Sequence, residues 1–429
     1  MHNDDSVIPT KGATRLRGGI PLRTMNIRLI RFHSILLFSI LLLFSILPAF
    51  AETEDIDLAE ELEEWVDLEE ESRDILTATD IFYHTPNEQS PVKCDHETCF
   101  WKMEMGNLDG EAVWKVLTQP VTVLSGAQRE QVRVLARPEE DCRDYVGVVT
   151  CASQAVHVLE RGETWSLIEA YSSAEEGSAV KVFADAFQGY VKTSRLKEEE
   201  VDQTYGLVID KLQQRLYVFK EGKLFATLLC STGFAREDTP FHETPAGEFL
   251  VVSWTGGFWS EGNLWCDMGM RINSGILLHE VPCRILTDET TGEKKKDYSR
   301  CERYLGEKAS HGCIRIQKEK TPEGVNAKWL WDNLSRKPYT KVIIWDDLDR
   351  ELVYPDDSLT LYYNPEGGKN YHSAPACTLV RDKFEPMTAF PYGELDEKPY
   401  SKLAPCPGCA PQPRKEKIDE LNEKSRKRD

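Results

Sequence analysis

The amino-acid sequence predicts a mainly β protein built from several small domains. Many short segments of alternating apolar and polar residues, punctuated by glycine, occupy residues 111–198. A second set of short apolar segments occupies residues 204–348, where one amphipathic helix is expected at 325–335. A chain of 429 residues is too long for one ordinary core, so about two to four domains are expected.

Residues 1–51 have the features of a secretory signal peptide. Arginines precede the apolar run 35–47, and the small residues Ala49-Phe-Ala51 follow it. The run is shorter than the roughly 20 residues that span a bilayer, so cleavage is expected, with a membrane anchor as the alternative if the segment is retained. Met25 is an alternative start of translation. We therefore expect an extracellular protein.

The charge of the chain limits its partners. The formal net charge is −20 and the isoelectric point is near 5.0. Nucleic acid is not expected as a partner, because phosphate binding needs clustered lysines and arginines. Residues 52–110 are dense in Asp and Glu, with apolar residues at near-helical spacing, which predicts an acidic helical segment or linker.

The strand patterns of residues 111–198 predict a small β-barrel. Segments 156–168 and 189–196 resemble the bacterial SH3-like domain, which commonly accompanies wall-active enzymes as a targeting module. Cys142 and Cys151 are close in sequence and are expected to pair, since an exported chain permits disulfides. Cys94 and Cys99 form another local candidate pair.

The next domain begins with strands joined by tight turns. The turn Lys220-Glu-Gly222-Lys predicts a hairpin, and Cys230 is expected to be buried in a strand. The other predicted strands of this domain cover residues 205–209, 215–219, 224–230, 247–252, 275–278 and 341–345.

The segment Ser310-His-Gly-Cys-Ile-Arg315 contains the residue types of a cysteine nucleophile. Such a thiol must ionise, and it needs a base and donors for the oxyanion formed when a carbonyl is attacked. Gly312 allows close backbone approach and leaves its amide and that of Cys313 as oxyanion donors. His311 supplies one imidazole, and His279, at the end of a predicted strand, supplies another.

This segment resembles the signature of the L,D-transpeptidase catalytic-domain family. The blocks Ser231-Thr-Gly233, Thr244-Pro-Ala-Gly-Glu-Phe249 and Leu278-His-Glu-Val-Pro282 resemble further blocks of that family, over about 204–346. The resemblance implies a mainly β, sandwich-like domain around a narrow tunnel. It also implies a set of roles, with Cys313 as nucleophile, His279 as general base, His311 and Ser310 shaping the site, Gly312 and Cys313 as oxyanion donors, and Arg315 holding a substrate carboxylate or bracing the loop.

The sequence departs from the family pattern around the upstream histidine. Glu280 follows it where many members have Gly or Ser, and the gap before the cysteine holds an inserted loop with Lys294-Lys-Lys-Asp297. A disulfide between Cys283 and Cys301 would close this loop. Trp259 and Trp265 precede the histidine strand and are candidates to line the substrate groove, with a core role as the alternative.

The resemblance implies a function in cell wall biogenesis. The thiolate attacks the third residue of a peptidoglycan stem peptide, D-alanine leaves, and the side-chain amine of a neighbouring stem attacks the thioester. No catalytic cofactor is implied, and carbapenems are expected covalent inhibitors. The alternatives are an L,D-carboxypeptidase, in which water is the acceptor, and a catalytically inactive protein that binds the cell wall.

The C-terminal region predicts a small Cys/His module at 354–410. His372, Cys377, Cys406 and Cys409 supply one imidazole and three thiols, which resembles a small zinc-ribbon-like module with a structural zinc ion. Disulfide formation is the competing interpretation. The charged tail 411–429 is expected to be disordered or loosely helical.

Overall fold

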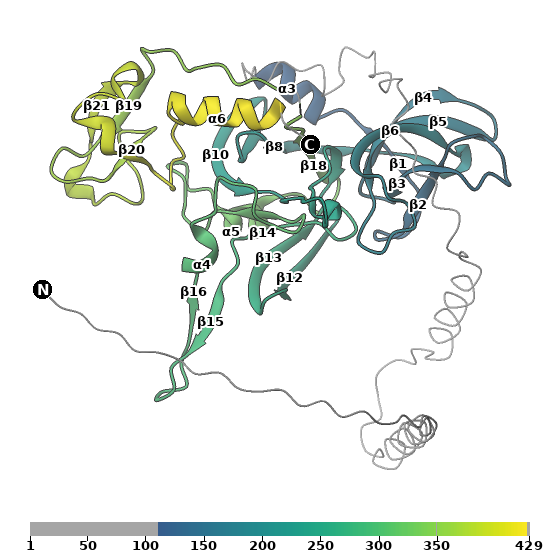
Figure 1. Ribbon diagram of the computed structural model, residues 1–429, viewed down its shortest axis with the longest axis horizontal. Helices are drawn as coiled ribbons and strands as arrows, with labels where there is room; N and C mark the ends of the chain where they lie inside the picture. The colour runs from purple at the N-terminus through teal and green to yellow at the C-terminus, as the bar shows by residue number, and fades with distance from the viewer. Residues whose placement is uncertain (1–109, 349, 427–429) are drawn as a thin grey trace, which may run out of the picture. The chain divides into compact units, whose positions relative to one another are not determined.

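The computed structural model describes residues 110–348 and 350–426 and confirms the mainly β fold class (Figure 1). The predicted signal peptide at 1–51, nearly all of the acidic segment at 52–110 and the pair Cys94 and Cys99 lie outside these residues. Among the described residues, no helix combines the length and apolarity that crossing a membrane requires.

The first part is a seven-stranded antiparallel sheet, here called the N-terminal sheet domain. Its strand order is β3-β2-β6-β5-β4-β1-β7. Valines and isoleucine on alternating positions pack into one core with Phe187 and Cys151. The alternating segments within residues 111–198 do form strands, as the sequence predicted. The strands are β1 (Val121–Leu124), β2 (Gln131–Leu135), β3 (Tyr145–Thr150), β4 (Ala155–Arg161), β5 (Trp165–Ser173), β6 (Phe183–Lys192) and β7 (Leu196–Glu199).

Two predictions for this region are wrong in the structure. Cys142 and Cys151 do not pair, and both are buried free thiols. Helix α3 (Gly110–Leu117), assigned to the barrel from the sequence, packs its apolar face on the next domain instead, against residues such as Val208 and Phe219. The amine of buried Lys341 donates a hydrogen bond of 2.8 Å to the carbonyl of Val116, near the C-terminus of this helix.

The central part is a nine-stranded sheet, here called the catalytic domain because it contains the predicted nucleophile Cys313 and the predicted base His279. Its strand order is β11-β18-β8-β9-β10-β17-β14-β13-β12. Two pairs are parallel, β18 with β8 and β14 with β17. Its strands are β8 (Val201–Asp210), β9 (Arg215–Lys220), β10 (Lys223–Ser231), β11 (Gly247–Leu250), β12 (Ser253–Ser260), β13 (Leu264–Arg271), β14 (Leu277–Glu280), β17 (Ile314–Ile316) and β18 (Tyr339–Trp345).

The catalytic sheet curls around one core. Phe249 at one end of the sheet and Met270 near the other end belong to the same fully buried cluster, together with Ile314 from the middle. Helix α5 (Ala327–Asn333) closes this core with Leu330, as the sequence predicted. Its N-cap is Asn326, whose side chain accepts a hydrogen bond of 3.0 Å from the Trp329 amide.

The N-terminal sheet domain and the catalytic domain share a core and an ion network. Val123 from the first packs with Leu250 from the second in one buried cluster. His157 Nε2 lies 2.9 Å from the carboxylate of Glu248, which also pairs with Lys341. Hydrogen bonds to Glu169 and Glu248 raise the pKa of His157 to about 9, although burial opposes this shift.

The predicted inserted loop forms a separate hairpin of strands β15 (Arg284–Thr287) and β16 (Lys294–Asp297), followed by helix α4 (Ser299–Glu302). Cys283 and Cys301 flank this hairpin, but the predicted disulfide is wrong in the structure, because both are free buried thiols. Cys301 instead packs as a small apolar residue with Leu264 and Val281.

The C-terminal part consists of a small sheet and a helix. The sheet has the order β21-β19-β20-β22, and its strands are β19 (Thr360–Tyr363), β20 (Asn370–His372), β21 (Thr388–Pro391) and β22 (Ala404–Pro405). The short 3₁₀ helices of the described residues are η2 (Thr193–Arg195), η3 (Pro240–His242), η4 (Asp382–Phe384), η5 (Tyr392–Glu394) and η6 (Tyr400–Lys402).

The tail predicted as disordered or loosely helical contains a docked helix, α6 (Lys415–Arg426). Ile418 on this helix is 2% exposed. The side chain of Asn422 accepts a hydrogen bond from the Leu352 amide (2.7 Å) and donates one to the Leu352 carbonyl (3.0 Å). One buried apolar residue and one bifunctional amide therefore attach a helix whose overall sequence is highly polar.

Candidate active site

The loop before β17 carries the predicted nucleophile and is held in a conformation that needs glycine. Gly312 has φ of +110°, which L side chains rarely adopt. Its carbonyl accepts a hydrogen bond of 2.7 Å from the buried hydroxyl of Thr244, which in turn accepts one of 2.8 Å from the Gly233 amide. A Cβ on Gly233 would lie 1.9 Å from the His242 carbonyl oxygen, so this approach of segments also requires glycine.

Cys313 is half-buried at the end of this loop. Its thiol donates a hydrogen bond of 3.7 Å to the carbonyl of Gly275. Burial raises the pKa of the Cys313 thiol, and the backbone of Leu277 and the guanidinium of Arg315 offset this only in part. The resting sulfur is therefore protonated near neutral pH and needs a base to become a nucleophile.

Strand pairing brings His279 to the same face of the sheet as Cys313. In the parallel pair of β14 and β17, Leu278 lies opposite Ile314 and His279 lies opposite Arg315. Leu278 and Ile314 both point into the core. Because side chains alternate along strands, His279 and Cys313 both point away from it, on strands about 4.8 Å apart. Both residues line one cavity of about 1150 Å³.

The hydrogen bonding of His279 suits it to act as a base. Its Nδ1 lies 2.7 Å from the backbone carbonyl of Glu280, so Nδ1 carries the proton and Nε2 has a free lone pair. Burial and the nearby guanidinium of Arg315 together lower the pKa of His279 to about 4, although the hydrogen bond to Glu280 opposes this shift. The imidazole is therefore neutral across the physiological range. Phe258 packs edge-on against the ring, with centroids 5.5 Å apart.

The neighbours of Cys313 in sequence have structural roles that the motif alone did not show. The Ser310 hydroxyl donates to the Cys313 carbonyl (2.5 Å) and accepts from the Gly312 amide (3.2 Å). The prediction that the Gly312 amide is free for an oxyanion therefore needs correction, because that amide is already engaged. His311 is exposed, stacks on His242 with centroids 4.2 Å apart, and lies 3.0 Å from a carboxylate oxygen of Glu261.

Arg315 and Trp265, the two predicted substrate-binding residues, differ in their placement. Arg315 lines the cavity, and among residues 110–348 and 350–426 no carboxylate lies within salt-bridge distance of it. Trp265 does not line the cavity, which corrects that prediction. Leu264 and Cys266 do, so alternation along β13 turns Trp265 to the other side, where its Nε1 donates to Asp267 at 2.9 Å. Trp259 contributes to the cavity wall, although it lies opposite Trp265 in the pair of β12 and β13 and its ring packs edge-on against that of Trp265, with centroids 5.2 Å apart.

A second, smaller cavity borders the same loop. It has a volume of about 180 Å³ and includes Gly275, His311 and Gly312 in its wall, with residues 172–176 of the N-terminal sheet domain opposite. One buried carboxylate oxygen of Glu175 has no hydrogen-bond partner among the described residues. The nucleophile loop is thus bordered by two cavities of different size.

Sequence reasoning missed several residues that build this site. Thr244 and Gly275 hold the loop and the thiol, yet neither is a residue type that signals catalysis, and neither is near Cys313 in sequence. His242 was missed although it stacks on His311. Cys230, predicted as buried, is 0% exposed, and burial raises the pKa of its thiol strongly. Only the tertiary structure shows that Thr244, Gly275 and His242 belong to the site.

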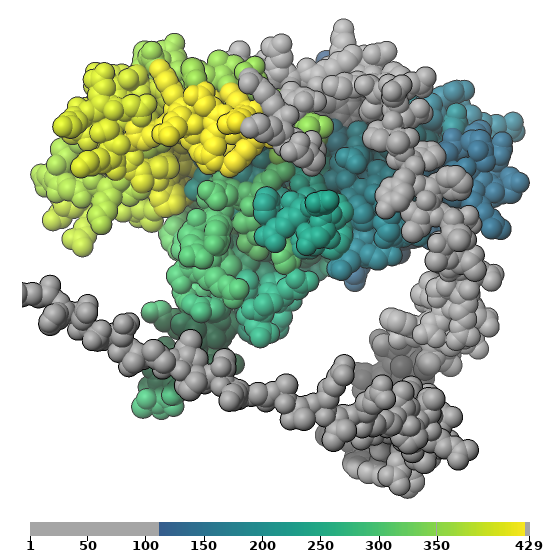
Figure 2. All heavy atoms as spheres, viewed as in Figure 1, coloured from purple at the N-terminus to yellow at the C-terminus, as the bar shows by residue number. Residues whose placement is uncertain are grey.

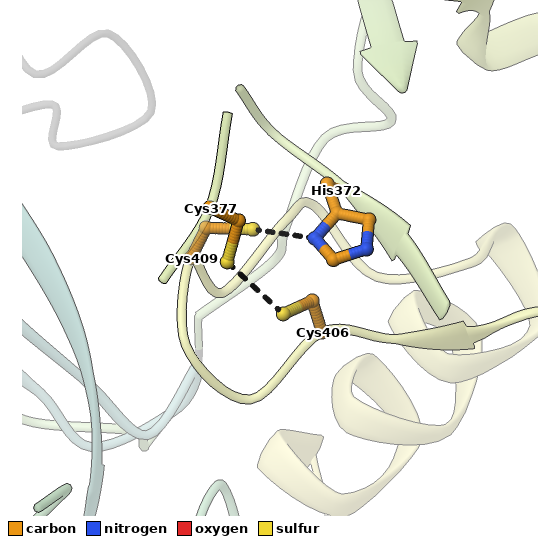
Figure 3. A group of neighbouring side chains, drawn as sticks. All are labelled: His372, Cys377, Cys406 and Cys409. Carbon is orange, nitrogen blue, oxygen red and sulfur yellow. Dashed lines mark hydrogen bonds between the residues drawn. The ribbon is translucent and has the colours of Figure 1, made fainter. Parts of the chain in front are cut away.

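The predicted metal ligands of the C-terminal part do come together (Figure 3). His372, Cys377, Cys406 and Cys409 are all buried, and their ligand atoms lie within 4.8 Å of one another. The three cysteines are free rather than disulfide-bonded. The sulfurs of Cys377 and Cys406 are 3.7 Å apart, and Cys409 Sγ is 3.5 Å from His372 Nδ1.

These spacings fit a tetrahedral ion. Zinc–sulfur bonds of about 2.3 Å and zinc–nitrogen bonds of about 2.0 Å place tetrahedral ligands roughly 3.8 Å apart for two sulfurs and roughly 3.5 Å apart for sulfur and nitrogen. The Cys377–Cys406 and Cys409–His372 separations of 3.7 and 3.5 Å match these values. The group therefore has the geometry of a structural metal site, remote in sequence from Cys313.

Comparison with known proteins supports the assignment of the central domain. Residues 204–344 match the L,D-transpeptidase catalytic domain family, YkuD. A Bacillus subtilis (strain 168) protein named "Putative L,D-transpeptidase YciB" is 27% identical over 192 residues, which are 43% of this chain and 89% of that protein.

Solved structures of L,D-transpeptidases are also similar in part. The enzyme from Xylanimonas cellulosilytica DSM 15894 is 18% identical with a TM-score of 0.22, and the match covers 33% of this chain and 60% of that one. The enzyme from Mycobacterium smegmatis is 15% identical with a TM-score of 0.25, and the match covers 54% and 92%. By sequence, residues 204–344 resemble an L,D-transpeptidase catalytic domain.

Proposed function

We propose that this protein is a peptidoglycan L,D-transpeptidase that cross-links stem peptides through a thioester on Cys313. One observation carries the proposal. Cys313 directly precedes β17, His279 lies on the adjacent parallel strand β14, and both line one cavity of about 1150 Å³. A thiol beside a neutral imidazole in an open cavity is the arrangement that acyl transfer by cysteine requires.

Acylation moves one proton and one acyl group. Nε2 of His279 takes the proton of the Cys313 thiol while sulfur attacks the carbonyl carbon of the third stem residue. Because the resting thiol has a raised pKa and the imidazole a lowered one, proton transfer accompanies attack rather than preceding it. The imidazolium then protonates the departing amine of D-alanine, and the acyl group remains on sulfur as a thioester.

Deacylation by an amine completes the cross-link. His279 Nε2 accepts a proton from the attacking side-chain amine of a second stem, and the thiol is regenerated. The second cavity, of about 180 Å³, supports this outcome over hydrolysis, because it offers a separate approach to the loop. The unpartnered carboxylate oxygen of Glu175 in its wall suits an ammonium group. Water as acceptor gives the competing carboxypeptidase reaction.

The Cys/His group is proposed to hold a structural zinc ion. His372 and the three cysteines Cys377, Cys406 and Cys409 supply one nitrogen and three sulfurs, a ligand set typical of closed structural sites. The ion would cross-link β20 to the turn after β22 in a module that otherwise has a small core of its own.

The location of the protein is also a proposal. The signal-peptide pattern of residues 1–51 supports export, and the strand pattern of the N-terminal sheet domain supports the SH3-like, wall-targeting role. Carbapenems are proposed to acylate Cys313, because their strained amide carbonyl presents the same electrophile to the thiolate.

Muropeptide analysis tests the proposed function. Purified protein is incubated with muropeptides whose stems are tetrapeptides, and the products are separated by mass. New dimers that appear with the wild type and vanish with Cys313→Ala support the proposal. Cys266→Ala is the matched control, because Cys266 lines the same cavity without belonging to the loop, and it is expected to retain activity. Tripeptide monomers alone contradict cross-linking and favour the carboxypeptidase. No product from either protein favours a binding protein.

A further inference from the structure

The cavity that contains Cys313 extends well beyond the nucleophile and ends against helix α6. Lys417, Leu421 and Lys424 of this helix line the cavity. These positions have spacings of four and three residues, so they form one face of the helix. The adjacent side of the helix is attached by Ile418 and Asn422. Figure 2 shows the C-terminal residues, in yellow, beside the catalytic domain, in teal and green.

The wall of this cavity is strongly basic, in contrast to the rest of the chain. Eight lysines and arginines line it against three carboxylates, a formal excess of five positive charges, whereas the whole chain carries −20. An anion is therefore attracted only at short range, once it reaches this cavity. The basic residues are Lys211, Arg236, Arg300, Arg303, Lys308, Arg315, Lys417 and Lys424, and the acidic ones are Glu261, Glu307 and Asp347.

The lysines and the arginines of this wall differ in their partners. Lys308 is paired with Glu243 and Asp347, and Lys417 and Lys424 share the carboxylate of Glu420. The four arginines, in contrast, have no carboxylate within salt-bridge distance among residues 110–348 and 350–426. They are Arg236, Arg300, Arg303 and Arg315.

Two of these arginines are supported by aromatic rings rather than by acids. The guanidinium of Arg236 lies 5.3 Å from the ring centroid of Phe234, and that of Arg303 lies 4.7 Å from the ring centroid of Tyr304. The guanidinium of Arg303 also donates a hydrogen bond of 2.9 Å to the Tyr304 hydroxyl. The rings restrict both side chains while leaving donor groups of each fork open to a ligand.

We propose that these arginines bind the carboxylates of the donor stem peptide, so that the enzyme prefers donors with free carboxylates over donors whose carboxylates are amidated. This inference rests on the proposed function. A guanidinium fork bonds a carboxylate through two charge-assisted hydrogen bonds. A carboxamide is neutral, so it cannot accept two hydrogen bonds of this charge-assisted kind. Arg315, two residues after the nucleophile, lies at the inner end of the set, and Arg300 and Arg303 follow the hairpin of β15 and β16.

The position of the arginines favours a peptide as the anionic ligand. The acylating peptide must enter the cavity that holds Cys313, and the arginines line that same cavity. A phosphate-bearing wall polymer presents anionic groups too, but it has no stem carbonyl to bring to the thiol. We therefore assign the arginines to the donor peptide, and competition by the polymer becomes an outcome of the test.

The experiment compares two donor peptides as substrates of the full chain. One is a disaccharide-tetrapeptide with free carboxylates, and the other has the same structure with its carboxylates amidated. The rate of D-alanine release is measured for the wild type and for the double variant Arg300→Gln/Arg303→Gln, at low and at high salt. The matched control is Arg161→Gln/Arg381→Gln, which removes two exposed arginines that do not line the cavity.

The free-carboxylate donor is expected to react faster with the wild type. The double variant is expected to lower kcat/KM for that donor about fourfold to twenty-fivefold, because each of the two exposed charge pairs is worth about twofold to fivefold, and high salt reduces the difference. The control variant and the amidated donor are expected to show little change. Iodoacetamide, a small neutral probe, is expected to alkylate Cys313 equally in all variants, which verifies the fold and the nucleophile.

Four results would overturn the inference. Equal wild-type rates on the two donors show that carboxylates are not recognised, and an equal loss in the control variant shows a general charge effect. Inhibition by a phosphate polymer that the double variant abolishes, without discrimination between donors, assigns the arginines to the polymer. If neither donor reacts although iodoacetamide labels Cys313, the proposed function fails first, and this inference falls with it.

Discussion

Replacement of Thr244 by valine tests whether the loop geometry described above controls the nucleophile. The Thr244 hydroxyl is fully buried, accepts a hydrogen bond from the Gly233 amide (2.8 Å) and donates one to the Gly312 carbonyl (2.7 Å). Valine has nearly the same shape but no oxygen. Thr244→Val therefore leaves one buried donor and one buried acceptor without their partner, next to the glycine that precedes Cys313.

The expected cost follows from those two groups. An unsatisfied buried backbone group costs about 1–3 kcal/mol, so the variant, which leaves two such groups, is expected to lose about 2–6 kcal/mol of unfolding free energy. Many domains have only about 5–15 kcal/mol in total. Thr244→Ser is the matched control, because it keeps both hydrogen bonds and loses one buried methyl group, worth about 1 kcal/mol.

Two measurements test this reasoning. Urea denaturation gives the unfolding free energies of the three proteins, and D-alanine release is measured where the valine variant is still folded. We expect Thr244→Val to lower kcat at least about tenfold, because a loosened Gly312 no longer fixes the approach of sulfur to the carbonyl. Thr244→Ser is expected to stay close to the wild type. If valine and serine variants have the same stability and the same kcat, the hydroxyl does not hold the loop.

Three further predictions follow from other parts of the structure. Raising the pH should cost the protein up to about 3 kcal/mol of stability, because the pKa of His157 is raised to about 9 from its ordinary 6.5. This stability is complete below pH 6.5 and is lost as the pH rises through 9, so urea denaturation at pH 6 and pH 10 should differ for the wild type and far less for His157→Gln. Elemental analysis of the full chain should find about one zinc ion per molecule. Either Cys409→Ser or a chelator should abolish zinc binding and lower the melting temperature. A zinc content that Cys409→Ser leaves unchanged contradicts the site. Trp259→Ala should raise KM for the donor, while Trp265→Phe should leave KM unchanged, because only Trp259 lines the cavity; the reverse result in steady-state kinetics places Trp265 in the groove.

The sequence alone determined the features that are encoded locally. Alternating apolar residues predicted most strands of both large sheets, since a strand that buries one face needs this period. The segment Ser310–Arg315 predicted the nucleophile. The set His372, Cys377, Cys406 and Cys409 predicted a group of metal ligands, and these four residues do come together. The helix at 327–333 was likewise visible from its apolar face.

Tertiary structure alone decided how distant segments meet. The pairing of Cys313 with His279 depends on a parallel register between β14 and β17, and the engaged amide of Gly312 depends on where the Ser310 hydroxyl points. Neither disulfide predicted within the described residues formed, because proximity in sequence does not set the distance between two sulfurs.

The polar helix α6 shows the same limit most clearly. Its sequence lacks the apolar stripe that marks a packed helix, and it was expected to be disordered or loosely helical. It is attached to the fold by the buried side chains of Ile418 and Asn422, and its adjacent face completes the wall of the active-site cavity. Local sequence patterns indicate which residues are apolar enough to be buried. The residues that pack against them or bond to them come from elsewhere in the chain, and only the folded structure brings these together.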